Sequence, residues 1–151
     1  MKRSIKVYSL CLAVLCAVVA GCRETVPIKE MSLAKADMSR AISVKADKYA
    51  PAELQASKEK LFECHQQVKK EDLEKATKAA VESQKKAIEA YNKAVPLLAK
   101  DTIEIAEKSL QEADEAAAPL LAKPEYGVAE KLVKDAQDKF ENKKYYEAYL
   151  G

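Results

Sequence analysis

Cys64 and His65 are the residues of this 151-residue chain that could support nucleophilic or metal chemistry, and His65 is the only histidine. A cysteine becomes a reactive thiolate through a nearby base or a metal ion. Adjacent side chains on a helix point about 100° apart, however, so the pair is poorly placed to share one ion. We predict that Cys64 joins an apolar stripe while His65 faces solvent. The sequence therefore predicts no catalytic residue, metal site or cofactor, and the alternative is an enzyme centred on this pair.

The N-terminus has a second cysteine with a chemical role, Cys22. A basic start is followed by an apolar run over residues 7–20, which is short for a membrane-spanning helix. Such a run before small residues is typical of a cleaved signal peptide. The segment Val19-Ala20-Gly21-Cys22 resembles the lipobox of bacterial lipoproteins. That resemblance implies that residues 1–21 are removed and that Cys22 becomes the lipidated first residue; an ordinary secreted protein is the alternative.

The same resemblance implies a place in the bacterial cell. Residues 22–28 would form a short linker between the lipid and a helical domain over residues 29–151. Arg23 differs from the aspartate that retains lipoproteins at the inner membrane in some Gram-negative bacteria. We therefore expect a membrane partner through the lipid anchor, at the outer membrane, with the domain on its periplasmic or surface face.

Removal of residues 1–21 changes the charge and the cysteine count. The full chain has 26 basic and 24 acidic side chains, and this segment holds three of the basic ones and no acid. The remainder carries 23 against 24, so a basic surface for nucleic acid is not indicated. Cys11 and Cys16 leave with the segment and Cys22 takes the lipid, so Cys64 has no partner for an intramolecular disulfide.

The composition after residue 21 is typical of an all-α protein. Alanine, lysine and glutamate are strong helix formers, and no segment alternates with the period of a strand. We predict an antiparallel bundle of about five helices, at 29–47, 52–68, 71–95, 102–118 and 125–141.

The helix predicted at 71–95 carries an unbroken heptad seam of mostly small side chains. Its members are Leu73, Ala76, Ala80, Ser83, Ala87, Ala90, Ala94 and Leu97. Small residues let two helix backbones approach closely. We expect this seam to pack within the chain, and the alternative is a surface that recruits a helix of another protein. A second seam runs from Ile103 to Leu120.

The pentapeptide PLLAK occurs twice, at residues 96–100 and 119–123. Asp101 with Glu104 fits a helix N-cap directly after the first copy. Because proline is disruptive inside a helix, both copies are predicted to be corners between antiparallel helices. At least one leucine of each pair should then be buried. One long helix kinked at Pro96 is the alternative.

An internal repeat is predicted from eight identities between the segment that starts at Ser32 and the segment 77 residues later. Tyr49 corresponds to Tyr126 in this alignment. The repeat units would span about 29–95 and 102–151, with the second incomplete.

Residues 30–95 resemble a family of alanine-rich helical domains in bacterial envelope lipoproteins, whose function is unknown. The likeness rests on Tyr49-Ala50-Pro51, Leu54, Ala56 and the ladder from Ala76 to Ala94. Some members carry an additional peptidoglycan-binding domain, for which this chain has no room. A weaker likeness, through Phe140 and the segment Lys144–Ala148, is to tetratricopeptide repeats.

The tyrosines Tyr145, Tyr146 and Tyr149 are the predicted partner-contact residues, because tyrosine is enriched at interfaces. In the alternative, Tyr146 packs the last half-turn onto the bundle. These features together predict a lipid-anchored, non-enzymatic binding or scaffolding protein. A chaperone-like holdase, which needs an exposed apolar groove, or a tetratricopeptide-like adaptor is the alternative. The partner would be an envelope protein, and no small-molecule substrate is indicated.

Overall fold

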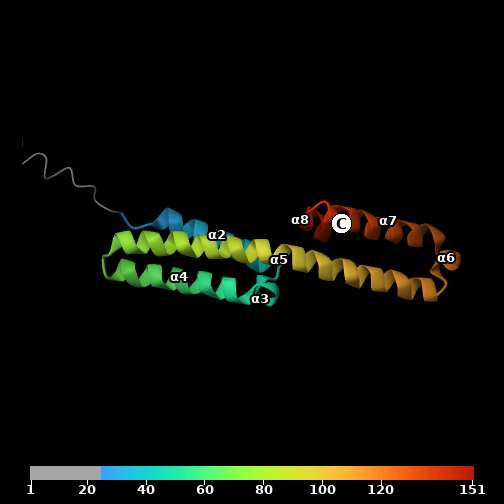
Figure 1. Ribbon diagram of the computed structural model, residues 1–151, viewed down its shortest axis with the longest axis horizontal. Coiled ribbons are helices and arrows are strands. Elements are labelled where there is room, and N and C mark those ends of the chain that lie inside the picture. Colours follow the sequence, from blue (N-terminus) through green and yellow to red (C-terminus); the bar gives the residue numbers. More distant parts are fainter. Residues whose placement is uncertain (1–24) are drawn as a thin grey trace, which may run out of the picture.

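The computed structural model describes residues 25–151, and this part is all-helical, as predicted. Its helices are α2 (Ile28–Ser43), α3 (Ala46–Tyr49), α4 (Pro51–Lys69), α5 (Leu73–Glu115), α6 (Ala118–Leu121), α7 (Lys123–Glu141) and α8 (Tyr145–Leu150). The long α5 is the axis of the molecule (Figure 1). Helices α2 and α4 pack along its N-terminal part, and α7 lies beside its C-terminal part. Helix α8 packs against α5 near the middle of that long helix.

Helix α5 continues through Pro96, so the predicted corner at the first PLLAK is wrong and the alternative of one long helix is confirmed. Proline removes one helix hydrogen bond. Packing on both sides of it opposes a break. Val95 and Leu98 are buried in one cluster with residues of α2, α3 and α4, and Ile103 is buried in a second cluster with α7 and α8.

The predicted N-cap, Asp101, lies inside α5 and has another role. Its carboxylate accepts hydrogen bonds from Lys48 Nζ at 2.8 Å and from the Tyr49 hydroxyl at 2.6 Å. These two donors hold the pKa of Asp101 below its usual range. The short helix α3 is thereby tied to α5 just beyond Pro96.

The second PLLAK is a corner, as predicted, because Pro119 lies in the one-turn helix α6 between α5 and α7. Its leucines are not buried. Leu120 is 85% exposed and Leu121 is 83% exposed, whereas Leu98 of the first copy is 2% exposed. The expectation of a buried leucine is therefore confirmed for the first copy and wrong for the second.

The fold repeats with a period of 72 residues, not 77. Helices α4 and α7 have 19 residues each, and their first residues, Pro51 and Lys123, are 72 apart. The turns repeat with the same spacing, because left-handed backbone occurs at Lys45 (φ 55°) and Ala117 (φ 60°) and again at Glu71 (φ 60°) and Lys143 (φ 59°).

In this register, Tyr126 is equivalent to Leu54 and not to Tyr49. Alanines that recur every three or four residues also produce identities in shifted registers, which explains the error in the alignment.

Side-chain packing follows the 72-residue period as well. Cys64 and Ala76 form a buried cluster with Met31 and Val68. The residues 72 positions later also lie together, in the cluster shared by α5, α7 and α8. In the same order, they are Ala136, Ala148, Ile103 and Phe140.

Two successive three-helix units therefore share α5. Unit one comprises residues 28–99, with α2, α4 and the first part of α5 as its helices. Unit two comprises residues 100–151, with the rest of α5, α7 and the short α8 in the equivalent places.

The small-residue seam of α5 packs inside unit one, so the intramolecular interpretation is confirmed. Every member from Ala76 to Ala94 is buried. At Ser83, the hydroxyl donates to the Ser57 carbonyl at 2.8 Å, and the Ser57 hydroxyl donates to the Ser83 carbonyl at the same distance. Such reciprocal bonds require the backbones of α4 and α5 to lie close together.

We predict that Leu98→Ala destabilises the protein by about 2–5 kcal/mol, because it empties a packed site in the cluster next to Pro96. Leu97 is 41% exposed, so Leu97→Ala should cost less than about 1 kcal/mol and serves as the matched control. Pro96→Ala should stabilise α5 by about 1–2 kcal/mol, because it restores a helix hydrogen bond. Urea unfolding followed by circular dichroism measures all three, and a larger loss from Leu97→Ala than from Leu98→Ala would contradict the packing of α5.

Candidate functional site

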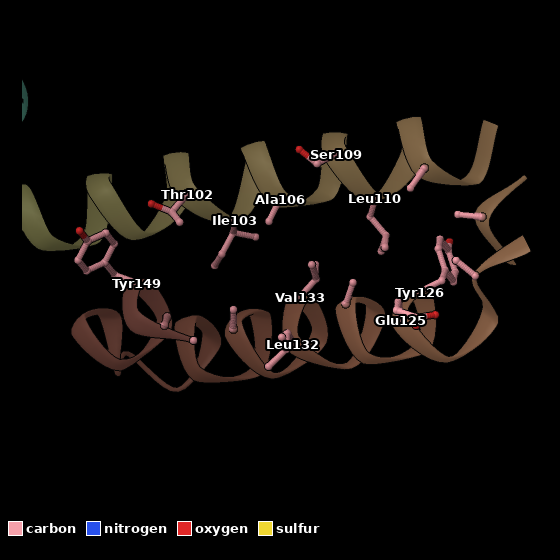
Figure 2. A pocket seen from close by; sticks show the side chains of 17 residues that line it. Thr102, Ile103, Ala106, Ser109, Leu110, Glu125, Tyr126, Leu132, Val133 and Tyr149 are labelled. Atoms are coloured by element: carbon pink, nitrogen blue, oxygen red, sulfur yellow. The ribbon is translucent and has the colours of Figure 1, made fainter. Parts of the chain in front are cut away.

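An open apolar groove of about 530 Å³ lies between the C-terminal part of α5 and α7, and we call it the α5–α7 groove (Figure 2). Its lining residues are Thr102, Ile103, Ala106, Ser109, Leu110, Ala113, Ala118, Ala122, Glu125, Tyr126, Ala129, Leu132, Val133, Ala136, Ala148, Tyr149 and Gly151. Most of these side chains are apolar, so the groove offers burial of apolar surface and few groups for catalysis.

Two helical stripes form the walls of the groove. Ile103, Ala106 and Leu110 recur at spacings of three and four along α5, and Val133 with Ala136 continues the same pattern on α7. Figure 2 shows Ile103, Leu110 and Val133 pointing toward the space between the helices. The helices are held as a hairpin by the corner at α6 and by the cluster around Ile103 and Ala136.

The ends of the groove differ in character. Tyr149 of α8 lies at one end, beside Thr102, and Tyr126 lies at the other end, next to α6 (Figure 2). Desolvation, together with the negative charges of Asp114 and Glu130, raises the pKa of Tyr126. Glu125 also lies on this rim. The end near α6 is therefore the acidic end.

The groove is the counterpart of a surface that unit one covers. The equivalents of Ala113, Ala118, Ala122 and Tyr126 are Ala41, Ala46, Ala50 and Leu54. All four of those unit-one residues are buried in a single cluster beneath α5, against Ala90, Ala94, Val95 and Leu98. Helix α8 corresponds to only the first six residues of α5, from Leu73 to Lys78. Where Ala80 to Ala94 lie in unit one, the groove of unit two is open.

The three predicted contact tyrosines have different environments. Tyr145 is half-buried, and its ring meets Phe140 edge-on with 5.1 Å between centroids. Tyr149 is also half-buried and forms part of the groove wall. Tyr146 is 46% exposed, so the alternative in which it packs the last half-turn is wrong, and Tyr145 and Tyr149 have that role. The structure thus brings only Tyr149 to the groove.

Cys64 is fully buried beside Ala76, Ala79 and Ala80, as predicted, and burial raises the pKa of its thiol. His65 is half-buried on the neighbouring face of α4. Within residues 25–151, no three histidine, cysteine, aspartate or glutamate side chains gather in a way that could hold a metal ion.

Cys22 lies outside the described residues, and so do the predicted signal peptide and the first residues of the linker. In the part of the chain that the structure describes, no helix combines the length and the apolar character needed to cross a membrane.

The fold and the groove define a class: an all-helical protein of two successive three-helix units, one closed and one open. Comparison with known protein families, with curated proteins and with solved structures finds no match for this chain.

We predict that one substitution at equivalent positions has opposite consequences in the two units. Ala41 is fully buried under α5, so Ala41→Glu should destabilise the fold by about 3–5 kcal/mol through an unpaired buried charge. Ala113 faces the open groove and is half-buried, so Ala113→Glu should cost about 1 kcal/mol or less. Chemical denaturation of the two variants provides the comparison, and equal losses would show that the groove is closed in solution.

Proposed function

We propose that this chain is a lipid-anchored protein of a bacterial cell envelope that acts as a non-enzymatic binding or scaffolding module. The α5–α7 groove carries this proposal. A concave, mostly apolar groove of about 530 Å³ has the size and the lining that are typical of a binding site. The groove also lies on one part of a molecule whose other part is closed and packed.

The lipid anchor is supported by Val19-Ala20-Gly21-Cys22 after a short apolar run. From Cys22 to the start of α2 at Ile28, the chain reaches roughly 25 Å at full extension. Residues 73–99 of α5 add about 40 Å of helix before unit two begins. Unit one would thus act as a spacer, and the groove of unit two could stand well away from the lipid surface. Arg23 after the lipidated cysteine favours the outer membrane.

A holdase is the second candidate, and the open apolar groove is the observation that favours it. A holdase binds unfolded chains, whose backbone groups need hydrogen-bond partners when they are buried. The groove walls are helices whose backbone groups are already bonded internally, so they favour a guest with the same property. The 72-residue unit also differs from the 34-residue period of a tetratricopeptide-like adaptor. A scaffold that binds folded partners is therefore the better match.

We expect Cys22→Ala to abolish lipidation, and the chain should then be released from the membrane or retain its signal peptide, because two or three acyl chains provide the firm anchoring. Membrane fractionation and intact mass of the purified protein measure the change, with Cys64→Ala as the control. If the intact mass of the wild-type protein shows no lipid on Cys22, the proposed anchor is excluded.

The binding role has its own test. A photo-crosslinking amino acid at Leu110, which lines the groove, should capture a second polypeptide in intact cells. The same group at Lys58, which is exposed on α4, is the control. If Leu110 gives no more crosslinking than Lys58, the binding role is excluded.

A further inference from the structure

The open groove of unit two has a covered equivalent in the same molecule, and that equivalent shows what kind of surface fits it. In unit one, residues 79–99 of α5 lie over α2 and α4. Their buried face is alanine and serine at heptad spacing as far as Ala94, and Val95 and Leu98 complete it. The residues that line the groove of unit two correspond one by one to the covered residues of unit one, with Leu110 in the place of Met38 and Val133 in the place of Leu61.

We infer that the α5–α7 groove binds an amphipathic α-helix of another protein that presents alanine or serine at heptad spacing and a basic residue near Glu125. This inference rests on the proposed binding function and names the chemistry of the partner. The helix would take the place that residues 79–99 occupy in unit one. It would lie antiparallel to α7 and follow on from α8.

The length of the partner helix follows from the open part of the groove. Helix α8 already fills the positions equivalent to Leu73–Lys78, and Gly151 lines the groove at the position equivalent to Ala79. The free part corresponds to Ala80–Ala94. A helix of at least 15 residues, or about four turns, fills it.

Small side chains are required because the walls leave little depth. Over α4, the seam of α5 comes so close that the Ser57 and Ser83 hydroxyls reach each other's backbone carbonyls. The equivalent of Ser57 in unit two is Ala129, which lines the groove and has no hydroxyl. Alanine is therefore favoured in the partner opposite Ala129, whereas a large side chain there would hold the helices apart.

The basic residue follows from the acidic end. In unit one, Lys93 of the covering helix forms an ion pair with Glu53 of α4 at 2.7 Å. The equivalent of Glu53 is Glu125, on the groove rim and next in sequence to Tyr126, on which the charges of Asp114 and Glu130 act. A lysine or arginine at the position of Lys93 would meet this negative end, and a partner with an acidic residue there would be repelled.

Two exposed leucines lie at the same end. Leu121 is equivalent to Tyr49, which is half-buried and bonded to Asp101 in the part of α5 that follows the covering segment. Leu121 is 83% exposed, and its neighbour Leu120 is 85% exposed. A partner helix that runs on by one or two turns past the groove would cover Leu121. This is the same place where α5 covers Tyr49 in unit one.

The probe for the test is a synthetic peptide of residues 79–101 with Ser83→Ala and an N-terminal fluorophore. It copies the covering helix and matches Ala129. The peptide is titrated with the full chain as purified from cells, in lipid nanodiscs if it fractionates with membranes. Saturable binding is expected, with affinity at least about tenfold weaker for the Ala113→Glu protein because that change places a charge in the groove.

Matched peptides locate the contact face. Ala90→Glu in the peptide should weaken binding at least about tenfold, because in unit one Ala90 is buried in the same cluster as Ala41. Val81→Glu adds the same charge at a position that is 50% exposed in unit one, and it should change affinity by less than about twofold. Glu125→Lys in the protein should weaken binding of the parent peptide, and a peptide with Lys93→Glu should restore binding to that protein variant.

Several results would overturn the inference. These are an absence of saturable binding at about 100 µM peptide, which is the range of a weak interface, or equal binding of the Ala90→Glu and Val81→Glu peptides. Sedimentation of the full chain tests for a dimer. If a dimer is present, if the peptide does not dissociate it and if Ala113→Glu does, the groove is assigned to a second copy of this chain. If Leu110 crosslinks a polypeptide in cells but none of the peptides binds, the proposed binding function stands and a small-residue helix is excluded as the partner.

Discussion

The close packing of small side chains between α5 and its neighbours is the constraint from which the architecture follows. Alanine and serine bury little area each, so stability accumulates along many turns and not at a few large residues. The buried seam from Ala76 to Ala94 provides these contacts in unit one, and the reciprocal Ser57–Ser83 bonds satisfy the polar groups that close approach would otherwise isolate. A helix that stabilises a fold in this way must be long and unbroken. The local cost of Pro96, which lacks one helix hydrogen bond, is offset by the clusters on either side of it.

The same constraint explains why the two units differ. Both have a first helix, a one-turn connection and a second helix of 19 residues. In unit one, a third helix then covers the apolar face of this pair. In unit two, only the six residues of α8 occupy the equivalent place, and they complete the cluster around Ile103 but leave Ala113 and Tyr126 open. The groove is thus a regular position of the repeat over which residues 25–151 place only α8, and the exposure of Leu121, the equivalent of Tyr49, has the same origin.

The continuity of α5 also has a mechanical consequence for the proposed function. One helix is the last of the closed unit and the first of the open unit, so the two units are joined without a flexible linker. In sequence, a lipid anchor at Cys22 would come shortly before the start of α2 at Ile28, and the residues that line the groove begin at Thr102, after the last residue of unit one. Such an arrangement suits a scaffold that presents a binding site at a defined distance from a membrane.

From the sequence alone, local patterns determine the helical class, the small-residue seam, the buried place of Cys64 and the corner at Pro119, because each depends on periodicity and propensity within one segment. The continuity of α5 could not be predicted in this way, since a proline signals a local cost and only the packing around Val95, Leu98 and Ile103 shows that the cost is met. The 72-residue period that relates the two units could not be predicted from the sequence either. The turns of the units use left-handed backbone at Lys45, Glu71, Ala117 and Lys143, where no glycine marks them. The groove itself is a property of the tertiary structure, because an apolar stripe has the same sequence whether or not another helix covers it.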